Sequence, residues 1–135
     1  MAKTDDSAKA YGHIAVIGGG AWGTALALAA VQAGAKALLW ARESGVVDSI
    51  NGRHENAQFL PGIALPPAIA ATGDLAAAAR APALLIVVPA QHLRAVLKDL
   101  APRIAPGTPL MLCATTAFTE HMHRFTERAH KLSVN

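Results

Sequence analysis

The sequence has one cysteine, few aromatic side chains and no long apolar run. Cys113 is the only cysteine in 135 residues, which excludes an intrachain disulfide framework and suits a reducing cytosol. No apolar stretch approaches the roughly 20 residues that a membrane span needs. The first ten residues carry acids and lack an apolar core, so they predict no signal peptide. These scarcities favour a cytoplasmic protein without a membrane span.

The sequence also lacks a large excess of positive or negative charge. The formal net charge is only +3, and no cluster of lysine and arginine predicts a nucleic-acid surface. The weak positive balance is compatible with small anionic ligands. His121, His123 and His130 fit no standard zinc spacing, and the one cysteine lies upstream of them. We therefore expect no nucleic-acid partner and no metal site.

Short aliphatic runs alternate with helical patterns through residues 12–114, which we expect to form a single domain. The alternation predicts an α/β fold, a doubly wound parallel sheet with right-handed crossovers and strand order 3-2-1-4-5. Residues 1–11 are expected to be a disordered leader, and residues 115–135 a tail. The predicted strands are 13–17, 37–40, 69–71, 83–88 and 110–114, and the predicted helices are 21–33, 45–51, 75–80 and 91–100.

Local signals refine these elements. Gly34 follows the first helix, where a glycine can adopt the left-handed conformation. Asp74 is placed to cap the third helix. The run ALLIVV at 83–88 is typical of a strand buried on both faces. Cys113 is predicted to be a buried structural cysteine in the fifth strand, not a nucleophile. The expected apolar face of the first helix comprises Trp22, Leu26, Ala29, Ala30 and Ala33.

One motif indicates a ligand. Residues 18–23 read GGGAWG and match G-x-G-x-x-G between a predicted strand and a predicted helix. Gly18 would permit the tight turn, Gly20 the approach of a pyrophosphate, and Gly23 the close packing of helix on strand. Unpaired N–H groups at the helix start would bind the phosphates. The motif predicts a Rossmann-type dinucleotide-binding domain; the alternative is a glycine-rich turn without a ligand.

The end of the second predicted strand bears on the cofactor. About 20 residues after the glycine loop, NAD-binding domains carry an acid and NADP-binding domains an arginine. Here Arg42 occupies or adjoins that position, and Glu43 is displaced by one. The pattern favours NADP, or acceptance of both NADP and NAD. The alternative is that Arg42 is an ordinary exposed arginine.

Four segments, in order, resemble the bacterial NAD(P)-dependent glycerol-3-phosphate dehydrogenase family. They read IAVIGGGAWGTAL at 14–26, LWAR at 39–42, NAQFLPGIALP at 56–66 and VVPAQ at 87–91. The third segment is similar to the family pattern N-x-x-[FY]-L-P-G-x-x-L-P, which makes the resemblance more specific than the glycine loop alone. Phe59, within that segment, would either line the cofactor cleft or pack inside its own loop.

The resemblance implies roles for further residues. Ala21 and Trp22 would lie by the pyrophosphate, and Arg42 by the adenosine ribose. Pro89 and Ala90 would lie on the nicotinamide side. The implied reaction is hydride transfer between NAD(P)H and dihydroxyacetone phosphate, the latter being interconverted with sn-glycerol 3-phosphate for phospholipid precursor synthesis.

The resemblance ends at the fifth predicted strand. The family continues as C-A-K-G, whereas Thr115 stands here in place of the active-site lysine. A threonine offers no cation to a phosphate or to a developing alkoxide. The sequence stops at Asn135, before the helical substrate domain of that family, so we expect no catalytic residue in this chain. An apolar stripe at 4-3-4-3 spacing is predicted to form an amphipathic helix that packs on the sheet or on a second copy, as a homodimer: Phe118, Met122, Phe125, Ala129 and Leu132.

Three functions stay open at this point. The first is the cofactor domain of a glycerol-3-phosphate dehydrogenase, and the second is a stand-alone NAD(P)-binding module without catalysis. The third is another two-domain dehydrogenase, such as a 3-hydroxyacyl-CoA or ketopantoate enzyme, which the FLPG and VVPA segments disfavour. His92, near the start of the fourth predicted helix, could approach the cleft, although a surface or capping role is preferred.

Overall fold

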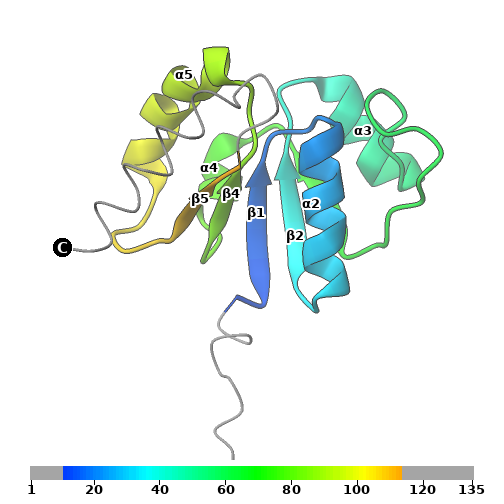
Figure 1. Ribbon diagram of the computed structural model, residues 1–135, viewed down its shortest axis with the longest axis horizontal. Coiled ribbons are helices and arrows are strands. Elements are labelled where there is room, and N and C mark those ends of the chain that lie inside the picture. Colours follow the sequence, from blue (N-terminus) through cyan, green and yellow to red (C-terminus); the bar gives the residue numbers. More distant parts are fainter. Residues whose placement is uncertain (1–10, 114–135) are drawn as a thin grey trace, which may run out of the picture.

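A parallel five-stranded sheet forms the centre of the protein (Figure 1). The computed structural model describes residues 11–113. The strand order is β3-β2-β1-β4-β5, which confirms the predicted doubly wound fold. Nearly all of the predicted leader and the whole predicted tail lie outside the described residues. The strands are β1 (His13–Ile17), β2 (Lys36–Trp40), β3 (Ile69–Thr72), β4 (Leu84–Ile86) and β5 (Leu110–Leu112).

The connecting helices begin and end close to where local signals predicted. The Asp74 side chain accepts a hydrogen bond from the Ala76 N–H at 3.0 Å, and so caps the short helix α4 (Leu75–Ala79). Gly34 has φ of +99°, the left-handed conformation expected just after a helix. The helices are α2 (Ala21–Gln32), α3 (Ser44–Arg53), α4 (Leu75–Ala79) and α5 (Ala90–Leu100), followed by the 3₁₀ turn Ala101–Arg103.

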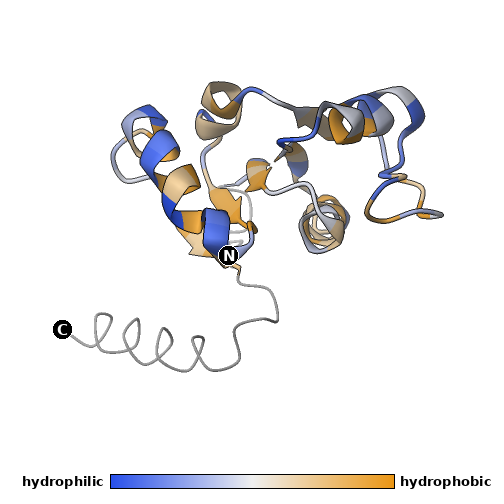
Figure 2. Cartoon of the chain, turned by 90° about the horizontal axis from the view of Figure 1, so that it is seen from above, coloured by the Kyte–Doolittle hydropathy of each residue, from blue (hydrophilic) through white to orange (hydrophobic). Residues whose placement is uncertain are grey.

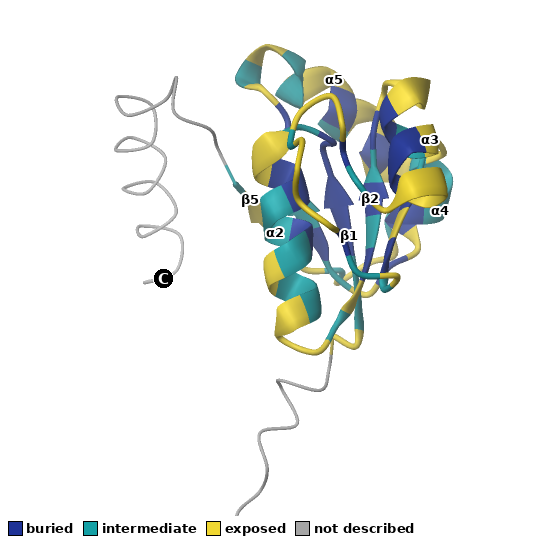
Figure 3. Cartoon of the chain, turned by 90° about the vertical axis from the view of Figure 1, so that its right-hand side faces the viewer, coloured by how far each residue is buried: buried dark blue, intermediate teal, exposed yellow. Residues whose placement is uncertain are grey.

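Two hydrophobic clusters lie on opposite faces of the sheet. Helices α2 and α3 cover the first cluster, and α4 and α5 cover the second. Strand β1 contributes to both, because Val16 lies in the first cluster while Ala15 and Ile17 lie in the second. Figure 2 shows apolar strands beside α5, which carries many polar residues, and Figure 3 shows the buried residues concentrated on the central strands. Among residues 11–113, no helix is long and apolar enough to cross a membrane.

The predicted apolar face of α2 was largely wrong, although one of its members, Leu26, packs against the first cluster. The buried residues of α2 are Gly23, Thr24 and Ala27, whereas Trp22 is 53 % exposed. Apolar residues occur on every side of this helix, so the pattern could not identify the face that packs. The close approach of the helix at Gly23 decides which side meets β1.

The predicted burial of the last strand was also wrong. The side chains of β5 are exposed, with Met111 at 62 %. Cys113 is only half-buried and directly follows the strand. β5 is the edge strand of the described sheet, and it pairs only with β4. The preceding strand is shorter than the predicted 83–88, but it is covered on both faces as predicted. Leu84 and Ile86 are buried in the second cluster, and the half-buried Leu85 packs against the first.

Candidate functional site

The glycine turn joins the end of β1 to the start of α2. Gly18 has φ of +136°, and a Cβ placed there would overlap the carbonyl oxygen of Val87. A Cβ at Gly23 would overlap the carbonyl oxygen of Gly18. The packing of the chain therefore requires glycine at both positions, in the roles that the sequence predicted.

Gly20 differs from these two glycines. A Cβ added at Gly20 would meet no atom within 4 Å, and its φ of −74° suits any residue. Nothing within the described chain requires glycine here. Gly20 also precedes the first turn of α2, where N–H groups lack intrahelical acceptors. The open space beside Gly20 is therefore suited to an anion that approaches the backbone closely.

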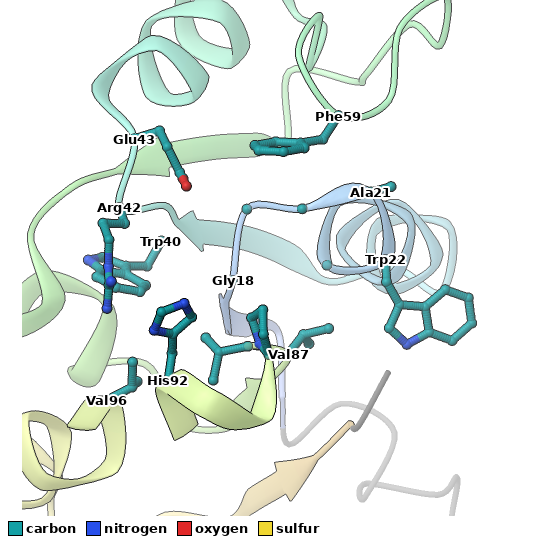
Figure 4. A pocket seen from close by; sticks show the side chains of 15 residues that line it. Gly18, Ala21, Trp22, Trp40, Arg42, Glu43, Phe59, Val87, His92 and Val96 are labelled. Atoms are coloured by element: carbon teal, nitrogen blue, oxygen red, sulfur yellow. The ribbon is translucent and has the colours of Figure 1, made fainter. Parts of the chain in front are cut away.

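A pocket of about 380 Å³ lies beside this turn, at the carboxyl ends of the central strands (Figure 4). That volume is within the range of small-ligand sites. In open α/β sheets ligands bind at this edge, where the strand order reverses. Its lining includes residues 18–23 and, from other segments, Arg42, Glu43, Phe59, Pro89 and His92.

The predicted site residues come together in this pocket with one exception. Ala90 begins α5 but is not among the lining residues. Figure 4 shows Phe59 and Val87 on opposite sides of the glycine turn, with Trp22 at one end of the pocket and Arg42 at the other. The binding role of each residue remains a prediction. The shared location supports it.

Other lining residues were missed or undervalued. Trp40 lines the pocket beside the position of Arg42, and its indole N–H donates to the carbonyl oxygen of Gly73 at 3.2 Å. His92, for which a surface or capping role was preferred, also lines the pocket. A signal for His92 existed in the sequence, since a residue in the first turn after β4 lies at the same sheet edge as the glycine loop.

A compact loop covers the other side of the glycine turn. It runs from residue 54 to residue 65, and its ends meet where the Leu65 N–H donates to the carbonyl oxygen of His54 at 2.7 Å. Asn56, inside this loop, is fully buried and donates to the carbonyl oxygen of Gly19 at 2.9 Å. The FLPG segment is therefore attached directly to the glycine turn.

The remaining candidates do not form a reactive site in the described part of the chain. Residues 11–113 contain no group of three side chains that could hold a metal ion. Partial burial raises the pKa of the Cys113 thiol, so the nucleophilic thiolate is disfavoured. His121, His123, His130 and Thr115 lie outside the described residues.

A glycine turn at the first strand–helix junction, an open pocket beside it and the reversed strand order define a dinucleotide-binding domain of the Rossmann type. The family model described as the N-terminus of NAD-dependent glycerol-3-phosphate dehydrogenase matches residues 13–132. The chain belongs to this family. The match extends beyond residue 114, where the resemblance of the sequence motifs ended.

Individual relatives agree with this assignment. The chain is 63 % identical over 105 residues to glycerol-3-phosphate dehydrogenase (NAD(P)+) of Parvibaculum lavamentivorans, covering 78 % of this chain and 32 % of that protein. A solved glycerol-3-phosphate dehydrogenase from Coxiella burnetii superposes with a TM-score of 0.72 at 35 % identity, covering 76 % of this chain and 32 % of that one. The chain thus spans about a third of the length of these relatives. This membership decides against the third open function, another type of two-domain dehydrogenase.

Proposed function

We propose that the chain binds NADP(H) or NAD(H) in the pocket beside the glycine turn. The carrying observation is the contrast at that turn: Gly18 and Gly23 are required by the chain's own packing, whereas Gly20 faces open space. The chain's own packing does not explain why a glycine stands at this helix start. A pyrophosphate held closely by backbone N–H groups does explain it. Backbone groups at Gly20, Ala21 and Trp22 would hold the pyrophosphate.

The adenosine ribose would lie at the Arg42 end of the pocket. Arg42 is exposed and follows β2, where an arginine accommodates a 2′-phosphate. Glu43 lines the same pocket and could accept from ribose hydroxyls. Both cofactors are therefore proposed as ligands, with NADP preferred.

Within the whole protein, the proposed activity is that of an sn-glycerol-3-phosphate dehydrogenase. The bound nicotinamide would exchange a hydride with dihydroxyacetone phosphate or glycerol 3-phosphate. The relative from Parvibaculum lavamentivorans, 63 % identical over 105 residues, is a glycerol-3-phosphate dehydrogenase, which supports this proposal. The product would enter phospholipid precursor synthesis in the cytoplasm, a compartment that the single cysteine suits.

The second candidate is a module that binds the cofactor without catalysis. One observation favours it for this chain alone: among the described residues, the ionisable groups that line the pocket are Arg42, Glu43 and His92, with no lysine. Thr115, predicted in place of the family lysine, lies outside the described residues. The predicted homodimer stays a prediction for the same reason, since its apolar stripe lies in that segment.

The test of cofactor binding is a titration of the chain with NADPH, followed by calorimetry and by tryptophan fluorescence. Both tryptophans, Trp22 and Trp40, line the pocket, so we expect saturable quenching. A Trp22→Phe variant separates the two signals, because Trp40 is then the only reporter. A folded chain that binds neither NADPH nor NADH at millimolar concentration would contradict the proposed function.

A further inference from the structure

We infer that Asn56 is a positioning residue for the cofactor. It orients the backbone of the glycine turn directly at Gly19 and, through Thr24, at Gly20, without contact with the cofactor. The Asn56 side chain is fully buried, in a loop that otherwise is largely exposed. It is not among the residues that line the pocket. This inference rests on the proposed binding of a dinucleotide.

The Asn56 amide makes three hydrogen bonds that tie two segments together. Its Nδ2 donates to the carbonyl oxygen of Gly19 at 2.9 Å and to Oγ1 of Thr24 at 2.8 Å. Its Oδ1 accepts from the Phe59 N–H at 3.2 Å. The network fixes the orientation of the amide, since a flipped amide would set Oδ1 against the Gly19 carbonyl oxygen and its NH₂ against the Phe59 N–H.

Thr24 completes the network from α2. Its hydroxyl donates to the carbonyl oxygen of Gly20 at 2.8 Å. A carbonyl oxygen can only accept, so the hydroxyl proton is committed to Gly20 and Oγ1 must accept from Asn56. Thr24 is fully buried as well, and no buried side-chain polar atom in the described residues lacks a partner. Each member of the pair therefore determines the direction of the other's bonds.

The consequence for the turn follows from peptide geometry. A trans peptide directs its N–H opposite to its C=O, and residues 11–113 contain no cis peptide bond. Because Asn56 holds the Gly19 carbonyl on the buried side, the Gly20 N–H points to the other side, where Gly20 lines the pocket. The Gly20 carbonyl accepts from the Thr24 hydroxyl and also from the Thr24 backbone N–H at 3.0 Å, so the side chain and the first helical bond together direct the Ala21 N–H away from the helix interior. These are N–H groups proposed to bind the pyrophosphate.

The same amide also fixes Phe59. Its bond to the Phe59 N–H sets the backbone of a residue that lines the pocket. One buried side chain thus holds both the turn that carries the proposed phosphate donors and the backbone of Phe59, whose ring lies beside that turn (Figure 4). In this segment, N-x-x-F-L-P-G, the asparagine therefore links the loop to the glycine turn.

The primary test replaces the hydroxyl of Thr24. Thr24→Val has nearly the same shape but neither donates to Gly20 nor accepts from Asn56, whereas Thr24→Ser keeps the hydroxyl. We expect Thr24→Val to weaken NADPH binding roughly ten- to a hundredfold, because it leaves one N–H of the buried Asn56 amide unpaired and removes the side-chain bond to the Gly20 carbonyl. Thr24→Ser should bind within about threefold of the wild-type chain, as a conservative variant that restores the network.

Asn56→Asp is the second variant, and Asn51→Asp is its matched control. The Asn51 amide also makes two backbone bonds, Nδ2 to the carbonyl oxygen and Oδ1 to the N–H of Ala71, both at 2.8 Å. These two bonds join α3 to β3 and do not involve the glycine turn. Both changes remove an amide donor, but only Asn56→Asp should weaken NADPH binding. Because Asn56 is buried and Asn51 is exposed, the free energy of unfolding is measured for both variants, and NADPH affinities are compared between folded preparations.

Two readouts separate positioning from a purely structural role. Adenosine 2′-monophosphate has no pyrophosphate, so its affinity should be unchanged in Thr24→Val while that of NADPH falls. In the ligand-free chain, the amide resonances of Gly20 and Ala21 should move in Thr24→Val and remain in place in Thr24→Ser. A folded Thr24→Val chain with unmoved Gly20 and Ala21 resonances, or with equal losses for both ligands, would overturn the inference.

Failure of the proposed function would look different. If the wild-type chain binds no NADPH, cofactor binding is refuted, yet the resonances of the ligand-free variants still show whether Thr24 and Asn56 orient the turn. If the wild-type chain binds NADPH and Thr24→Val binds it equally well, only the positioning role is refuted.

Discussion

At the scale of single residues, the glycines of the turn have different roles. Gly18 is required for folding, and Gly20 is proposed to be required only for binding. Gly20→Asn places a side chain in the proposed phosphate space at a position where asparagine is a favourable helix N-cap. We expect stability within about 1 kcal/mol of the wild-type chain and a loss of NADPH binding too large to measure. Thermal unfolding and calorimetric titration of the same preparation check both parts.

Gly18→Ala is the matched control for that variant. It adds a single carbon, yet this carbon meets the Val87 carbonyl oxygen at a backbone φ of +136°. We expect a loss of about 2 kcal/mol or more in the free energy of unfolding. Tight NADPH binding by Gly20→Asn, or unchanged stability of Gly18→Ala, would contradict this division of roles.

Arg42 is the residue expected to set the choice of cofactor. Arg42→Ala removes a charge-assisted contact to a 2′-phosphate, worth about 1.5–3 kcal/mol, or roughly ten- to a hundredfold in affinity. Because Arg42 is exposed, the effect should shrink as salt rises. NADPH affinity should fall and NADH affinity stay nearly constant, as measured by parallel titrations. Equal losses for the two cofactors would refute the role of Arg42.

At the scale of elements, the cap of α4 offers a test that leaves the pocket untouched. Asp74 accepts from the Ala76 N–H, and its own N–H donates to Oγ1 of Thr72 at 3.0 Å. Asp74→Ala should lower the free energy of unfolding by about 1 kcal/mol, and Asp74→Asn should retain most of it. NADPH affinity should not change in either variant. Denaturant titration measures the first effect and calorimetry the second.

Elements marked by local chemistry were predictable from the sequence, and those set by distant contacts were not. Asp74 and Gly34 mark helix ends through their own backbone preferences, so both predictions were confirmed. The role of Asn56 could not be predicted from the sequence, because its partners Gly19 and Thr24 lie 37 and 32 residues away. The exposure of β5 likewise depends on what lies beside it and not on its own apolar residues.

At the scale of the whole molecule, binding and turnover should separate. Positioning both reactants can supply about 7–11 kcal/mol of a barrier reduction, and the groups proposed for the described pocket would position only the cofactor. We expect no measurable oxidation of NADPH by the chain with saturating dihydroxyacetone phosphate. Absorbance at micromolar protein checks this. A turnover number of about 1–10³ per second would overturn it and indicate catalytic groups within this chain.

The sharing of β1 between two hydrophobic clusters has a consequence for synthesis on the ribosome. Every member of the first cluster except Val87 lies between residues 16 and 71, so this half can assemble while the rest is still being translated. The second cluster then contains only Ala15 and Ile17, with its other members still to come, from Ala78 onward. Until α4 and α5 emerge, one side of β1 stays uncovered in the nascent chain. A chain stalled after β3 should therefore be bound by chaperones more strongly than one stalled after α5.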